Sequence, residues 1–109
     1  MNYKIVFEYV YTFYSFDEEL DSAVRTESFS PDSRFTLDGQ EDGSFTASKL
    51  QRDHLGDFVV ITFPNTDKMI VRPNAVAELA YDEFFDSMGD NNHNVYIGTV
   101  RLEKDNFVN

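Results

Sequence analysis

No cysteine occurs among the 109 residues of this chain. Its absence excludes disulfide bonds, thiolate nucleophiles and thiolate metal sites, and it is typical of proteins in a reducing compartment. Positive charge is also scarce, with 9 Lys and Arg against 20 Asp and Glu and a net charge of −11. Because affinity for nucleic acids depends on cations that neutralise phosphates, we expect no direct binding to DNA or RNA. Anionic membrane surfaces are disfavoured for the same reason.

Long hydrophobic runs are missing as well. No apolar stretch approaches the roughly 20 residues that a membrane-spanning helix needs. The N-terminus lacks the basic segment and continuous apolar run of a signal peptide. We therefore expect no membrane association and a cytoplasmic location, in a bacterial cell.

Apolar bulk is plentiful despite the charge. Hydrophobic residues make up 41% of the chain, including 11 Phe and 6 Tyr. This content argues against disorder and is enough for a small core. The length and the absence of a linker predict one acidic domain spanning residues 1–109.

Residues 3–14 alternate between two kinds of side chain, and aromatic and β-branched residues fill the odd positions. A period of two predicts a long, half-buried strand. Shorter β-rich segments separated by turn residues predict two hairpins and a last strand. These segments are Ser33–Leu37 with Ser44–Ser48, Asp57–Phe63 with Lys68–Arg72, and Val95–Lys104. Residues 15–31 fit either a short capped helix or an acidic loop.

Residues Asn74–Met88 carry the signals of a helix. Asn74 is a good N-cap and Gly89 a good stop after the last turn. Apolar residues follow the spacing of three and four that a buried helical stripe requires, namely Val76, Leu79, Ala80, Phe84 and Met88. Strands joined by short turns pair antiparallel. The sequence therefore predicts an α+β fold, an antiparallel sheet of about five or six strands with one main α-helix packed on one face.

Catalytic and metal-binding patterns do not emerge. The two histidines, His54 and His93, have no nucleophile beside them and are interpreted as surface residues. The loop 38–43 begins with Asp and ends with Gly like a calcium loop, but Lys49 stands where that motif needs a bidentate Glu. Gly-rich phosphate loops and a Gly-x-Ser-x-Gly motif are absent. We expect no enzyme, no cofactor and no metal.

The distribution of charge is the informative feature. Three long segments contain acidic residues but no Lys or Arg, between Lys4 and Arg25, between Arg34 and Lys49, and between Arg72 and Arg101. On the predicted helix, the carboxylates of Glu78, Asp82 and Asp86 would lie one above the other at steps of about 6 Å. The candidate partner-binding residues are Asp17, Glu18, Glu19, Asp21, Glu41, Asp42, Glu78, Asp82 and Asp86.

Rows of carboxylates on a rigid frame can stand in for backbone phosphates and bind a basic groove. In size, charge and lack of cysteine the chain resembles the small acidic proteins that phages and mobile elements use against host nucleases: DNA mimics, anti-restriction proteins and anti-CRISPR proteins. The resemblance is one of composition and covers no aligned motif. It implies a non-catalytic inhibitor that binds the basic nucleic-acid-binding surface of another protein.

Two other functions fit the same composition. One is an immunity protein or antitoxin that neutralises a basic toxin. The other is an accessory or scaffolding domain whose charge serves only solubility. Aromatic residues exposed beside acidic ones would favour a tight protein interface, whereas core packing is the alternative for them. The candidates for such anchors are Tyr14, Phe16, Tyr81 and Phe85.

Overall fold

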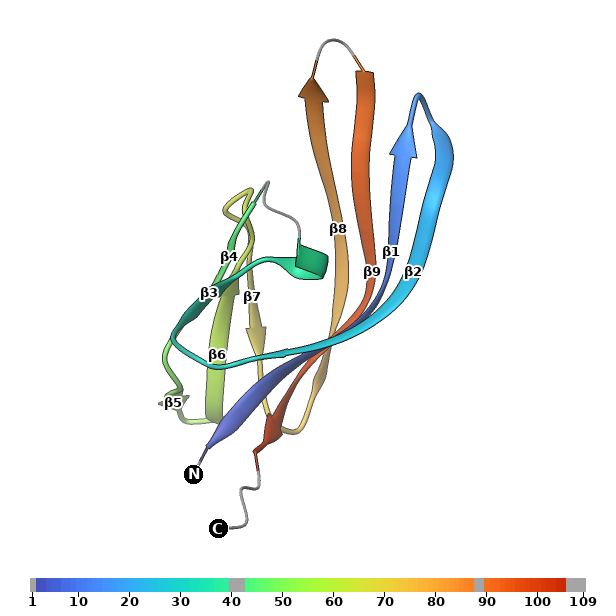
Figure 1. The fold of residues 1–109 in the computed structure, drawn as a ribbon. Helices are drawn as coiled ribbons and strands as arrows, with labels where there is room; N and C mark the ends of the chain where they lie inside the picture. The colour runs from blue at the N-terminus through green and yellow to red at the C-terminus, as the bar shows by residue number, and fades with distance from the viewer. Residues whose placement is uncertain (1, 40–42, 88–89, 106–109) are drawn as a thin grey trace.

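The chain is built mainly of two antiparallel β-sheets in the computed structural model, which describes residues 2–39, 43–87 and 90–105 (Figure 1). Four long strands form the first sheet in the order β2-β1-β9-β8. They are β1 (Tyr3–Ser15), β2 (Glu18–Phe29), β8 (Val76–Ser87) and β9 (Asp90–Lys104). Shorter strands form the second sheet in the order β3-β4-β6-β5, and β7 pairs with β6. They are β3 (Ser33–Phe35), β4 (Phe45–Ala47), β5 (Gln51–Asp53), β6 (Gly56–Thr62) and β7 (Lys68–Val71), with the 3₁₀ turn η1 (Leu37–Gly39) after β3.

The prediction of an α+β fold is wrong, because the described residues contain no α-helix. The segment expected to be the main helix, 74–88, instead forms strand β8, which pairs with β9 along its whole length. Leu79 and Tyr81 are buried on one face, at a spacing of two. Two members of the expected helical stripe, Val76 and Phe84, are 62% and 71% exposed.

Long-range pairing explains this difference. The segment fits a helical spacing and a strand spacing equally well, and local propensity is a weak preference that tertiary context overrides. As a strand it gains a complete hydrogen-bonded partner in β9 and buries its inward side chains against the second sheet.

The described part of the chain contains no helix long and apolar enough to cross a membrane.

Residues 15–31 form neither a helix nor an acidic loop. Most of them, Glu18–Phe29, make strand β2, which follows β1 after a two-residue turn at Phe16 and Asp17 and pairs with it antiparallel. Both turn residues have positive φ, 50° and 61°, as the tight hairpin turns that match strand twist require. Most side chains of β2 are exposed. Its sequence therefore lacks the alternation that marks a half-buried strand.

Several strand predictions are confirmed. The strand over residues 3–14 is β1, and both predicted hairpins form, as β3 with β4 and as β6 with β7. The last strand was expected over Val95–Lys104 and begins earlier, because residues 90–94 also belong to β9. Between the two hairpins, where no strand was predicted, lies the short strand β5.

The core lies between the two sheets and is rich in aromatic rings. Phe7 of β1 contacts the rings of Phe29, Phe35 and Phe45 with centroids 5.5 to 6.2 Å apart. The odd residues of β1 supply one wall, as the alternation predicted: Ile5, Phe7, Tyr9 and Tyr11 are buried and Tyr3 is half-buried. Opposite them lie Phe35, Leu37, Phe45, Ala47, Val59, Ile61, Phe63 and Val71.

The long strands extend beyond the second sheet at one end, called the upper end here (Figure 1). This end carries the β1–β2 turn and the beginning of β9. The backbone N–H of Phe16 in that turn donates a hydrogen bond of 3.1 Å to the carbonyl of Asn91. The molecule is accordingly elongated, with extents of 47 × 27 × 21 Å.

Candidate functional site

The outer face of the long sheet, turned away from the second sheet, carries an apolar row. Strand register aligns Val24, Val10, Ile97 and Ala80 across β2, β1, β9 and β8. Val24 is 79% exposed, Ile97 54% and Val10 41%. Three spacings between neighbouring strands make this row about 14 Å wide. Exposed apolar side chains gathered on one face are typical of protein-binding sites.

An aromatic row lies closer to the upper end on the same face. The ring of His93 stacks on Tyr14 and Phe84, with centroids 4.8 and 4.7 Å away. Phe84 is 71% exposed, whereas the His93 side chain is 14% exposed. Nδ1 of His93 lies 2.7 Å from Oδ1 of Asp82. Stacking therefore holds an exposed aromatic ring in place, which suits it to anchor a partner at low entropic cost.

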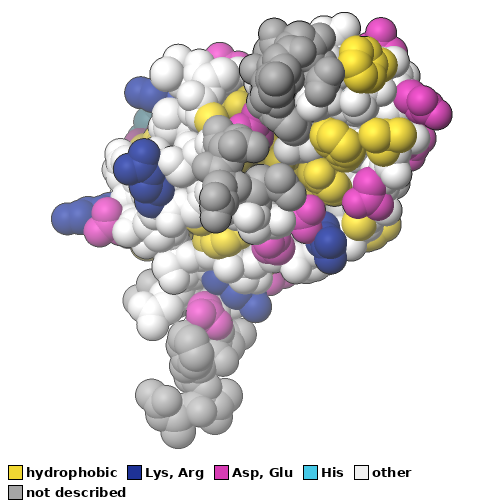
Figure 2. All heavy atoms as spheres, turned by 45° about the horizontal axis from the view of Figure 1, so that its top comes forward, with side chains coloured by type: hydrophobic (Ala, Val, Ile, Leu, Met, Phe, Trp, Pro, Cys, Tyr) yellow, Lys and Arg dark blue, Asp and Glu magenta, His cyan; other side chains and the backbone are white. Residues whose placement is uncertain are grey.

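Carboxylates flank these two rows at both edges of the sheet. Exposed Glu78 and Asp82 lie on the edge strand β8, one on each side of the level of Ala80. On the other edge strand, β2, the exposed Glu19 pairs with Tyr14 and lies on this face. Asp21 pairs with Phe13, which packs against the core, and Glu18 pairs with Ser15, so both lie on the opposite face. Seen from the upper end, Figure 2 shows hydrophobic side chains gathered at the surface with Asp and Glu side chains beside them. Glu19 of β2 and Glu78 and Asp82 of β8, far apart in sequence, thus border one sheet face.

The carboxylates expected to lie one above the other on a helix have a wider spacing on strand β8. Four residues along a strand span about 13 Å, so Glu78 and Asp82 lie about twice as far apart as helical geometry implied. The backbone of Asp86 continues β8 opposite Asn91, and its side chain lies outside the described part of the structure. The pattern is therefore two carboxylate positions at one edge of an apolar surface.

The remaining acidic candidates and the four candidate aromatic anchors lie in different parts of the structure. Asp17 is exposed in the β1–β2 turn, and Asp21 accepts a hydrogen bond of 2.9 Å from the backbone N–H of Ser22. Glu41 and Asp42 lie outside the described residues. Of the four candidate anchors, Phe16 is 64% exposed in the turn, Tyr14 belongs to the aromatic row and Tyr81 is buried in the core. The side chain of Phe85 is not among those described.

Ion pairs cover the lower part of the outer face. Arg101 pairs with Glu8 and, at 2.8 Å, with Glu103, whose pKa is lowered by the hydrogen bond from this guanidinium. Lys4 lies 3.9 Å from Glu103, and Val6, the strand partner of Arg101, is buried. Residues 5–24 and 73–100 contain no Lys or Arg. Negative charge therefore dominates the upper part of the face and is balanced in the lower part.

The two histidines belong to different sheets. His54 is exposed in the β5–β6 turn. His93 lies in strand β9 and contacts the carboxylate of Asp82 through Nδ1. Within residues 2–39, 43–87 and 90–105, no group of three or more His, Asp or Glu side chains is arranged to hold a metal ion.

Sequence reasoning missed the apolar centre of this face. None of Val10, Val24 and Ile97 was predicted from the sequence to be a binding residue. Their alignment depends on the register between strands, which connects residues up to 87 positions apart (Val10 to Ile97).

Comparison with protein-family models, with curated proteins and with solved structures finds no match for this chain. Function is therefore inferred from the geometry of the outer face.

Proposed function

We propose that this protein is a non-catalytic acidic inhibitor that binds the basic nucleic-acid-binding surface of another protein and blocks it. The observation that carries the proposal is the exposed apolar row of the outer face, which lies between two acidic edges. Apolar side chains at the centre of an interface supply the desolvated contact. Carboxylates at its rim speed association and select a positively charged partner.

Charge alone does not reproduce a nucleic acid on this face. Each strand of duplex DNA presents one phosphate per about 3.4 Å of helix axis. The carboxylates along β8 recur at steps of about 13 Å. Binding therefore depends on the apolar and aromatic rows together with the acidic rim. We expect an interface that salt weakens but does not abolish.

Affinity capture with matched variants tests the proposal. The protein is immobilised and exposed to a bacterial lysate at about 50 mM salt, where the screening length is about 14 Å. Ile97→Lys places a cation in the centre of the apolar row. Leu55→Lys is the control, because Leu55 is 66% exposed in the β5–β6 turn of the other sheet. We expect the captured partner to bind the wild type and the Leu55 variant equally and to be lost with the Ile97 variant.

The identity and the behaviour of the captured protein decide the rest. We expect a basic protein whose binding to a DNA or RNA duplex is competed by the acidic chain. Raising the salt to about 500 mM shortens the screening length to about 4 Å and should weaken the complex. A captured toxin that leaves nucleic-acid binding intact would favour the immunity function. Equal capture by all three proteins would contradict the proposal.

A further inference from the structure

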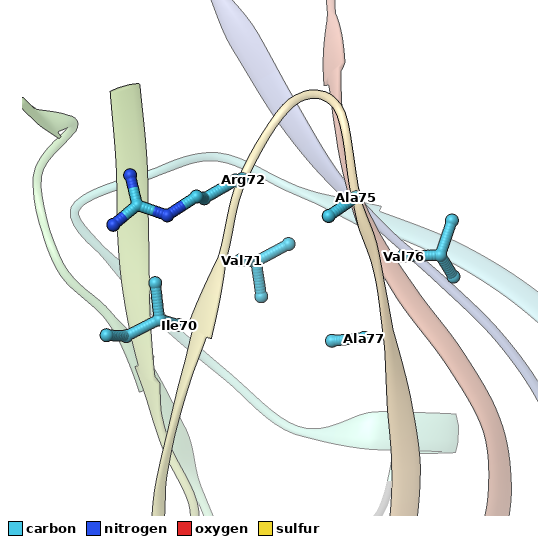
Figure 3. A pocket seen from close by; sticks show the side chains of 6 residues that line it. All are labelled: Ile70, Val71, Arg72, Ala75, Val76 and Ala77. Atoms are coloured by element: carbon cyan, nitrogen blue, oxygen red, sulfur yellow. The ribbon is translucent and has the colours of Figure 1, made fainter. Parts of the chain in front are cut away.

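A seam runs between β7 (Lys68–Val71) and β8 (Val76–Ser87), and the backbone edges that the two strands turn toward it are unpaired in the described residues. The two strands follow one another in the chain, joined by residues 72–75, but they belong to different sheets. In the described residues β7 pairs only with β6, and β8 pairs only with β9. Figure 3 shows the two strands diverging from their connecting turn. A partner strand can therefore hydrogen-bond to either exposed backbone edge.

One part of the seam is an apolar hollow. A cavity of about 350 Å³ lies beside the turn and is lined by Ile70, Val71, Arg72, Ala75, Val76 and Ala77. In Figure 3 the side chains of Val71, Ala75 and Ala77 point into the gap between the strands. Two of these three are alanines, which leave the space unfilled. The guanidinium of Arg72 is held away by two hydrogen bonds to Asp53, of 2.7 and 2.9 Å.

The next part of the seam is acidic. A second cavity, of about 340 Å³, is lined on the β8 side by Glu78, Ala80, Tyr81 and Asp82 and on the β7 side by residues that include Asp67 and Lys68. Three carboxylates and one ammonium group give it a net negative charge. Glu78 and Asp82 also form the acidic edge of the outer face. The seam therefore continues directly from the proposed binding surface.

We propose that this seam binds an extended basic segment of the partner protein. An aliphatic side chain of the segment fills the apolar hollow, and a Lys or Arg side chain enters the acidic one. The centres of the two hollows are about four residues apart on β8, or about 13 Å. Residues i and i+4 of an extended chain lie on the same face. The segment therefore carries an aliphatic residue and a basic residue four positions apart.

This inference deepens the proposed function and rests on it for the source of the segment, but its test uses synthetic peptides. Fluorescein-labelled decapeptides with a Thr and Ser host sequence carry Leu and Arg four positions apart. Two control peptides carry Leu and Arg three apart, or Leu and Glu four apart. Fluorescence anisotropy measures binding to the full chain. We expect the first peptide to bind at least about tenfold more tightly than either control, since each loses one anchor.

Two variants locate the peptide. Ala75→Leu fills the apolar hollow from an exposed position, and Glu78→Gln removes one carboxylate from the acidic hollow. Each should weaken the first peptide at least about fivefold, while Leu55→Ala leaves it unchanged. Equal binding of all peptides, or unchanged binding by both seam variants, would overturn the inference. An Ile97→Lys variant that keeps its partner while the seam variants lose the peptide would overturn the proposed function alone.

Discussion

Nδ1 of His93 on β9 lies 2.7 Å from a carboxylate oxygen of Asp82 on β8. The pair sits diagonally across two strands, since the direct partner of His93 is Phe84 and that of Asp82 is Val95. The hydrogen bond orients the imidazole, and the imidazole in turn stacks against the exposed ring of Phe84. One of the candidate carboxylates thus helps to fix the aromatic anchor of the proposed binding face.

The variant Phe84→Ala should weaken partner binding while leaving the stability of the fold nearly unchanged. Because the ring is 71% exposed, its removal should change the free energy of unfolding by less than about 1 kcal/mol. An aromatic anchor at an interface is worth at least about 2 kcal/mol, so affinity for the captured partner should fall about thirtyfold or more. Urea unfolding and surface plasmon resonance measure the two effects. Unchanged affinity would remove the aromatic row from the binding face.

Tyr11→Phe tests a buried hydrogen bond in the core. The hydroxyl of Tyr11 donates to Oδ1 of Asn94 at 2.9 Å, and Asn94 is 1% exposed. Loss of the donor leaves the amide oxygen buried without this partner, which should cost about 1–3 kcal/mol in the free energy of unfolding. Tyr14→Phe, on the outer face, is the matched control and should cost less than about 0.5 kcal/mol. Equal costs for the two variants would contradict the assignment.

Gly98→Ala tests the close approach of β9 to β1. A Cβ at Gly98 would lie 1.9 Å from the carbonyl oxygen of Glu8 and 2.6 Å from Cα of Tyr9. Both atoms belong to the backbone and cannot move aside without disturbing the sheet. We expect a loss of about 3 kcal/mol or more, at or beyond the upper range for overpacking. Thr99→Ser at the next position is the control. A melting temperature unchanged by Gly98→Ala would show that the strands lie further apart.

The pair of Asp53 and Arg72 predicts a specific acid dependence. The hydrogen bonds from Arg72 lower the pKa of Asp53 from 3.8 to about 2. A carboxyl whose pKa is depressed by folding stabilises the folded state above its unfolded pKa, and this stabilisation is lost as the pH falls through the folded value. The difference in urea midpoint between wild type and Asp53→Asn should therefore be constant above about pH 5 and shrink toward about pH 2. A difference independent of pH would contradict the pairing.

The alternation of apolar and polar residues predicted the half-buried strand β1 but gave no signal for the exposed strand β2. Strand β1 was evident because its odd residues face the core, and the two hairpins were evident from their turn residues. Strand β8 fits a helical spacing as well, and only its pairing with β9 decides between the two. Strand β2 has little buried surface, so its sequence resembles that of a loop. The acidic residues were visible at once, whereas the apolar row between them required the register of four strands.

Carboxyl labelling of the complex tests the central claim most directly. A carbodiimide and glycine ethyl ester modify accessible Asp and Glu side chains, and mass spectrometry compares their extents in the free protein and in the complex with the captured partner. We predict that Glu19, Glu78 and Asp82, at the edges of the outer face, are protected in the complex. Asp32, exposed in the turn between β2 and β3, should be labelled equally in both states. Protection of Asp32 with unchanged labelling of the three edge carboxylates would contradict the outer face as the binding surface.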